Sequence, residues 1–301
     1  MKKIFLACIT FSLLFLAVSC DKDLPYPVDQ VERGVLVDVY RVAGTDGVLS
    51  DGLTTGNYKI KLTIPAEQGD YSFMKCAQLL AVIQWADGKW SSCVVVDNIT
   101  QFPLEVTINV ADVYSKFSQS APGLGQTLYF TTNIVRNDGY TIPGWTELMG
   151  FNNVAFAGWM VDGRPYSSNV RYSVACPLDL DDFTGECFVY LDEWWEEEYP
   201  ITITRISETE LSIEGLFAGD ATNPLVIKVD LTDHSVSFGK QVLFPESGPA
   251  WWGRPPGAGY DNFALSAGVG TVNACDLSIS FRATATVDAG SFGAVSFKLG
   301  K

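Results

Sequence analysis

Runs of alternating apolar and polar residues follow one another from residue 34 to the end of the chain and predict an all-β protein. In the first half, six runs rich in β-branched and aromatic residues are separated by Gly, Asp, Asn and Pro. Their spacing fits a β-sandwich of the immunoglobulin or fibronectin kind. The segment DVYSKF predicts an added helical turn. The six runs are GVLVDVY, NYKIKLTI, QLLAVIQW, CVVVDNI, LEVTINV and TLYFTTNIV, and VRYSVACP follows as the last strand of this group.

The second half predicts eight further strands, and their alternation is cleaner. Short turn segments such as SET, TDH, NACD and VDAGS connect neighbouring runs, which favours an antiparallel meander. Eight such strands can close into an up-and-down barrel, and a sandwich is the alternative. The apolar faces that we expect to point inward are Leu225, Ile227, Val229 and Leu231 in one strand, and Leu277, Ile279, Phe281, Ala283 and Ala285 in another.

The change between these two patterns predicts a domain boundary. The acidic, proline-containing segment PLDLDDF separates them. A mature chain of this length favours two domains, with one large β-domain as the alternative. We therefore expect an immunoglobulin-like sandwich over residues 34–177 and a β-barrel over residues 180–301, meeting near 176–182.

The N-terminus has the pattern of an export signal. Lys2 and Lys3 precede a short apolar run, and the segment AVSC ends that run at Cys20. Small residues before a cysteine resemble a bacterial lipobox, so residues 1–19 would be removed and Cys20 lipidated. An ordinary secretory signal is the alternative. Residues 20–33 mix charges with prolines, which predicts a stalk with a reach of about 40 Å when fully extended.

The acidic composition excludes one class of partner. The chain carries 20 basic and 35 acidic residues, a net charge of −15, without a basic cluster. Such a surface repels phosphate backbones, so we expect no nucleic-acid binding. With 47% hydrophobic residues the chain has enough apolar material for a packed core.

The cysteines and the single histidine allow disulfides but do not predict a metal site. After Cys8 and Cys20, five cysteines remain, so at most two disulfides can form. Cys76 and Cys93 bracket a predicted hairpin and could pair, or both could be buried free thiols. No Cys/His spacing is typical of zinc. The single histidine, His234, lies in a predicted turn, where we expect it to be solvated. The five cysteines are Cys76, Cys93, Cys176, Cys187 and Cys275.

No catalytic or cofactor motif is present, so we expect neither an enzyme nor a bound cofactor. The segment LDEWWEEEYP, residues 191–200, offers carboxylates that a glycosidase could use, but adjacent acids on a loop are normally solvated and keep ordinary pKa values. The acids around residues 179–186 hint at calcium, yet Phe183 occupies a position that must ligate. Structural roles therefore explain both acidic segments better.

Four segments carry a resemblance to a known group of proteins. They are the lipobox with the following DKD, GQTLYFTTNIVRNDG, YSVACPLDLDDFTGE and CDLSISFRATATVDAGSFG. Together they resemble surface lipoproteins of Bacteroides-type bacteria that accompany SusC/SusD-type nutrient importers. The resemblance implies an immunoglobulin-like domain followed by a lipocalin-like β-domain, anchored by lipid on the outer face of the outer membrane. It covers most of the mature chain but carries no site residue.

Three functions follow for such a protein. It could be a non-catalytic binder of glycan or peptide nutrients, a carrier of an apolar ligand inside the barrel, or a purely structural subunit of an importer. The face with Leu277, Ile279 and Phe281 predicts a filled interior, which weakens the carrier interpretation.

One end of the predicted barrel carries the candidate binding residues. In an up-and-down meander the odd-numbered connections share one end, so residues 192–199 and the long loop 245–261 should lie together. Stacked aromatic rings beside carboxylates can hold a sugar ring or a peptide. The alternative is that these tryptophans plug the barrel mouth or pack against the first domain. The predicted rim consists of Trp194, Trp195, Trp251, Trp252, Arg254 and Tyr260, with the acids Glu196, Glu197 and Glu198 beside them.

Overall fold

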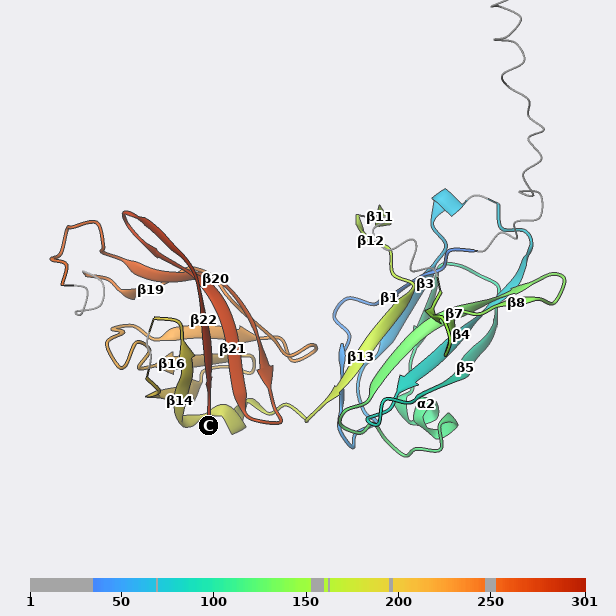
Figure 1. Cartoon of the computed structure of the whole chain (residues 1–301), viewed down its shortest axis with the longest axis horizontal. Coiled ribbons are helices and arrows are strands. Elements are labelled where there is room, and N and C mark those ends of the chain that lie inside the picture. The colour runs from blue at the N-terminus through green and yellow to red at the C-terminus, as the bar shows by residue number, and fades with distance from the viewer. Residues whose placement is uncertain (1–34, 69, 153–159, 162, 195–196, 247–252) are drawn as a thin grey trace, which may run out of the picture. The chain divides into compact units, whose positions relative to one another are not determined.

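The computed structural model describes residues 35–68, 70–152, 160–161, 163–194, 197–246 and 253–301 (Figure 1). Within these residues the chain is all-β, as the alternation predicted. The strands form two groups, each around its own apolar core, and the two cores share no side chain. The predicted export signal, the predicted lipidation site Cys20 and the predicted stalk lie outside the described residues, as do Trp195, Glu196, Trp251 and Trp252.

The first group of strands is a two-sheet sandwich. All its strand pairs are antiparallel except β2–β13, which is parallel. One sheet has the order β1 (Asp38–Arg41), β3 (Lys59–Thr63), β6 (Leu104–Thr107). The other has the order β2 (Val48–Ser50), β13 (Asn169–Ala175), β7 (Thr127–Arg136), β4 (Met74–Gln84), β5 (Trp90–Ile99), with β8 (Thr141–Ile142) paired to β7.

This strand order is the immunoglobulin order with one strand left out. Constant-type immunoglobulin domains place four strands in the first sheet and three in the second, and variable-type domains extend the second sheet at its edge. Here β5 is that extension. The strand that would pair with β6 is missing, because the chain passes from β5 to β6 through residues 100–103 alone. As a result β6 ends its sheet.

The segment after β6 forms the predicted helix. Helix α2 spans Val110–Lys116, and the side chain of Asn109 accepts from the backbone N–H of Asp112 to cap its first turn. Val113 and Tyr114 are buried in the sandwich core. The helix therefore packs against one end of the sandwich, directly after β6.

The connection between β7 and β13 is long and folds back onto the sheet. It carries the hairpins β9 (Trp145–Thr146) with β10 (Gly150–Phe151), and β11 (Met160–Val161) with β12 (Arg164–Pro165). The Trp145 ring stacks on Trp90 of β5, with their centroids 6.0 Å apart. This stacking fixes the first hairpin on the outer face of the sheet.

The second group of strands closes into an eight-stranded antiparallel barrel. Each strand pairs with the next along the chain, and β14 pairs with β22 to close the wall. The strands are β14 (Gly185–Asp192), β15 (Tyr199–Arg205), β16 (Glu210–Glu214), β17 (Leu225–Val229), β18 (Ser235–Phe238), β20 (Phe263–Asn273), β21 (Ser278–Val287) and β22 (Gly290–Gly300).

Two details of the predicted barrel were wrong. The segment SVSFGKQVLF, which the alternation predicts as one of the eight strands, is two short strands, β18 and β19 (Gln241–Phe244), which pair with different parts of β20. The predicted inward residue Leu231 is 47% exposed, because β17 ends at Val229 before reaching it. The other inward residues of that strand are fully buried.

Large side chains fill the interior of the barrel. Phe217, Phe263 and Phe297 are among the largest fully buried side chains of the described residues, and Ile279 and Phe281 face the same core. Phe217 lies at φ 55° in the 215–219 turn, and its ring contacts those of Phe263 and Phe297. The predicted filling of the interior is thus confirmed for these positions.

One disulfide is present among the described cysteines. It joins Cys176, just after β13, to Cys275 in the turn between β20 and β21. Cys76, Cys93 and Cys187 are free thiols. Cys76 and Cys93 therefore do not form the disulfide that was one of the two alternatives for them. No helix within the described ranges has the length and apolar character of a membrane span.

Candidate functional site

The structure brings the described members of the predicted rim to one end of the barrel. The ring of Trp194 lies 5.7 Å from that of Phe292, at the start of β22, and Phe292 lies 6.2 Å from Tyr260. The guanidinium of Arg254 is 5.0 Å from the centre of the Tyr260 ring. Residues from two connections, β14–β15 and β19–β20, thus meet the start of β22 there, and the meander predicted that these two connections share one end.

Trp194 belongs to the core more than to the surface. It is half-buried, and its ring packs against Phe217 and Phe263 at centroid distances of 6.2 and 5.7 Å. This is the plugged barrel mouth that was the alternative to a binding rim. Its ring caps the apolar interior, so a ligand would meet only part of it.

The outer part of the rim forms an exposed patch. We call Arg254, Tyr260 and Phe292 the barrel-end patch: Arg254 is exposed, Tyr260 is half-buried and Phe292 is 45% exposed. The loop beneath is tied down, since the N–H of Ala289 donates to the carbonyl of Gly259 at 2.8 Å. An arginine over an aromatic ring presents a flat surface with hydrogen-bond donors at its edge, which suits a sugar or a peptide.

Sequence reasoning missed a buried acid at this end of the barrel. The side chain of Asp192 accepts from the Tyr199 hydroxyl at 2.7 Å and from the backbone N–H of Trp194 at 3.0 Å. Burial raises the pKa of the Asp192 carboxyl, and it also raises that of the Tyr199 hydroxyl. The Tyr199 hydroxyl in turn accepts from the N–H of Phe217. Each group in this series of hydrogen bonds has a partner inside the fold, so the series holds the β14–β15 connection in place.

The other acids of the segment are on the surface. Glu197 and Glu198 are exposed, and Glu193 accepts from the backbone N–H of Ser296 at 3.1 Å. Such acids can contact a ligand at the patch, but none of these three is placed as a buried general acid.

The acids of the junction make structural contacts. Asp179 caps the short 3-10 helix η4 (Leu180–Phe183), and Asp181 pairs with Arg205 at 3.0 Å. No group of three or more metal-ligating side chains occurs in the part of the chain that the structure describes. His234 is half-buried and not solvated as predicted, and burial lowers its pKa.

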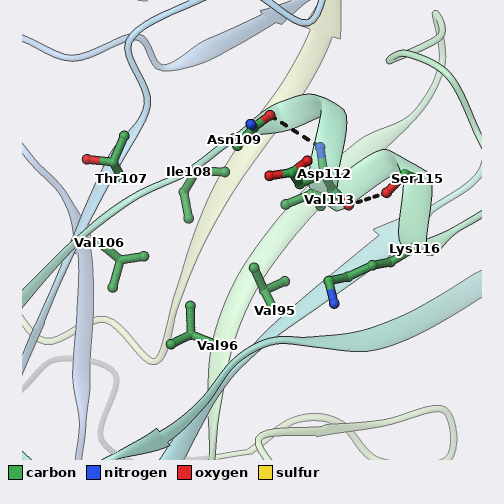
Figure 2. Close-up of a pocket in the computed structure, with 10 residues that line it drawn as sticks. All are labelled: Val95, Val96, Val106, Thr107, Ile108, Asn109, Asp112, Val113, Ser115 and Lys116. Atoms are coloured by element: carbon green, nitrogen blue, oxygen red, sulfur yellow. Dashed lines mark hydrogen bonds between the residues drawn. The ribbon is translucent and has the colours of Figure 1, made fainter.

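A second candidate site lies in the sandwich and was not found from the sequence. It is a cavity of about 500 Å³ between β5, β6 and α2, shown in Figure 2. This volume falls in the range of small-ligand sites. Its lining residues are Val95, Val96, Val106, Thr107, Ile108, Asn109, Asp112, Val113, Ser115 and Lys116.

The cavity has an apolar floor and a polar rim. Val95 and Val96 of β5 lie below, Val106 faces them from β6, and Lys116 reaches across from α2 (Figure 2). The three valines pack against the sandwich core and yet remain half-exposed. We call this cavity the β5–β6 groove. The signal in the sequence that could have revealed the groove is the short connection between β5 and β6, which leaves no room for a further strand between these two.

No family model, curated protein or solved structure matches this chain.

Proposed function

We propose that this protein is a non-catalytic binding subunit held on the outer membrane by lipid at Cys20, where it collects glycan or peptide nutrients for an importer of the SusC/SusD type. The observation that supports binding is the barrel-end patch. It sets an exposed arginine on an aromatic pair, with exposed carboxylates in the neighbouring connection. The lipid anchor and the importer rest on the sequence resemblance.

The filled barrel argues against the carrier alternative. A carrier needs an internal cavity, and here Phe217, Phe263, Phe281 and Phe297 occupy the interior. A purely structural subunit would use the same patch against a protein, so binding to free nutrients distinguishes the two.

The test compares matched variants of the full-length protein. Affinity gel electrophoresis with soluble polysaccharides, and titration with a peptide digest, should give retardation or heat with at least one of them. The variant Arg254→Ala with Tyr260→Ala should weaken that binding at least tenfold, because both the stacking and the guanidinium are lost. Tyr140→Ala is the matched control, since Tyr140 is an exposed ring beside Arg136 in the sandwich.

Two outcomes would contradict the binding function. Binding that survives the double variant would place the ligand elsewhere. A wild-type protein that binds neither probe class, but is recovered with an importer from its own membrane, would be a structural subunit. Cys20→Ala should leave binding intact and remove the protein from the membrane fraction, and its retention there would refute the anchor.

A further inference from the structure

The β5–β6 groove lies where an immunoglobulin sandwich has a further strand, and we propose that it accepts an extended segment of a partner protein as that strand. The segment would pair with β6 and lay alternate apolar side chains between the two sheets. This site is separate from the barrel-end patch and does not rest on the proposed function.

The first argument is the unpaired backbone of β6. A strand at the end of a sheet presents a row of N–H and C=O groups without strand partners. Strand β6 pairs only with β3, through the register Lys59↔Thr107 to Leu62↔Leu104, and β5 likewise ends the other sheet. An occupant that offers alternating donors and acceptors along its length satisfies this edge, and an extended peptide does so by its main chain.

The second argument is the incomplete burial of inward-facing side chains. On β3, Ile60 and Leu62 are 0% exposed, because β1 and β6 flank them. Their partners on β6, Leu104 and Val106, face the same core but are only half-buried. Strand β5 repeats the pattern with Val95. An added strand with apolar residues at alternate positions would cover these side chains from the open side.

The third argument concerns the charge and length of the occupant. The ammonium of Lys116 extends over the groove in Figure 2, and no ion pair is found for it within the described part of the chain. An acidic residue or a C-terminal carboxylate near one end of the segment would pair with it. Strand β6 has four residues, so the paired part of the segment is short.

A second copy of this chain fits the groove less well. Two copies would each bring a net charge of −15, and Glu105 stands on the edge strand itself. Like charges placed close together on paired strands are destabilising. The partner is therefore a different protein, and self-association becomes an outcome that the test can detect.

The experiment uses the full-length protein and a phage-displayed library of random nonapeptides. We expect enrichment of sequences with apolar residues at alternate positions and an acidic residue toward one end. A synthetic peptide of the enriched sequence should bind in a fluorescence anisotropy titration. Thr107→Arg, at an exposed position on the groove rim, should weaken this binding at least tenfold. Thr202→Arg places the same charge on an exposed strand position of the barrel and should leave the affinity unchanged.

Two further measurements separate strand addition from other kinds of binding. Lys116→Glu should change the selected residue from acidic to basic, which a merely structural role of Lys116 would not do. The bound peptide should slow amide hydrogen exchange in Leu104–Thr107, because the free edge becomes hydrogen-bonded.

Four results would overturn the proposal. They are the absence of any enriched sequence, equal binding to Thr107→Arg, binding that leaves the exchange of β6 unchanged, and a concentration-dependent dimer whose β6 is already protected. The last result would identify a second copy as the occupant.

Discussion

Asp192 holds a carboxylate inside the end of the barrel, between the Tyr199 hydroxyl and the backbone of the next connection. Removing a carboxylate from water disfavours its charged form, and here burial outweighs the two hydrogen bonds, so the pKa is raised. The folded protein therefore binds a proton at this site more tightly than the unfolded chain does.

This difference predicts a pH dependence of stability. From the ordinary value of 3.8 up to the raised pKa, the folded state holds more protons at Asp192, so its stability falls as pH rises. Asp192→Asn cannot ionise and lacks this dependence. The unfolding free energy of the wild type minus that of Asp192→Asn should fall through this window and then level off.

Denaturant unfolding at a series of pH values measures this difference. A flat or rising difference for Asp192→Asn would show that Asp192 is not destabilised by burial.

At the level of the strand, the segment between β17 and β20 is divided into β18 and β19, and beside β19 a side chain replaces the backbone as the partner of β17. The Gln241 amide accepts from the N–H of Val226 at 2.8 Å and donates to the carbonyl of Val226 at 2.6 Å. It thus makes the pair of bonds that a neighbouring strand residue would make across an antiparallel ladder.

Gln241→Ala should reduce the unfolding free energy by about 1–3 kcal/mol, because it leaves both polar groups of a half-buried residue without their partner. Asn223→Ala removes one exposed hydrogen bond, to the carbonyl of Val242, and should cost less. Equilibrium denaturation of both variants gives the comparison. A Gln241→Ala protein as stable as the wild type would mean that water replaces the amide without loss.

The strands themselves were largely predictable, since a period of two marks one buried face. Ile279, Phe281, Ala283 and Ala285 are buried as expected. The alternation of apolar and polar residues did not reveal the irregularities in the strands. A bulge between Val189 and Leu191 shifts the register of β14 and turns Asp192 inward, although its neighbours Leu191 and Glu193 are both exposed. The β5–β6 groove was not predicted either, because it arises from the absence of a strand between β5 and β6.

For the molecule as a whole, the cysteine pairing was beyond the sequence. Five cysteines allow many pairings, and only the folded chain brings Cys176 and Cys275 together across 99 residues. The bond links the junction after β13 to a turn of the barrel. It closes a long loop, and closing a loop of this length is typically worth several kcal/mol of stability in the chain-entropy account.

The junction and the disulfide together predict an unusual proteolysis pattern. Pro177 and Asp179 are exposed and Leu178 is half-buried, between the last sandwich strand and η4. We expect thermolysin to cut first before Leu178, because each side of the junction packs around a separate core. The cut chain should run as one band on a non-reducing gel and as two fragments after reduction. In Cys275→Ser the fragments should separate without reductant.

Early cuts inside 34–177 or 180–301 would refute two independently folded domains. Wild-type fragments that separate without reductant would refute the disulfide alone.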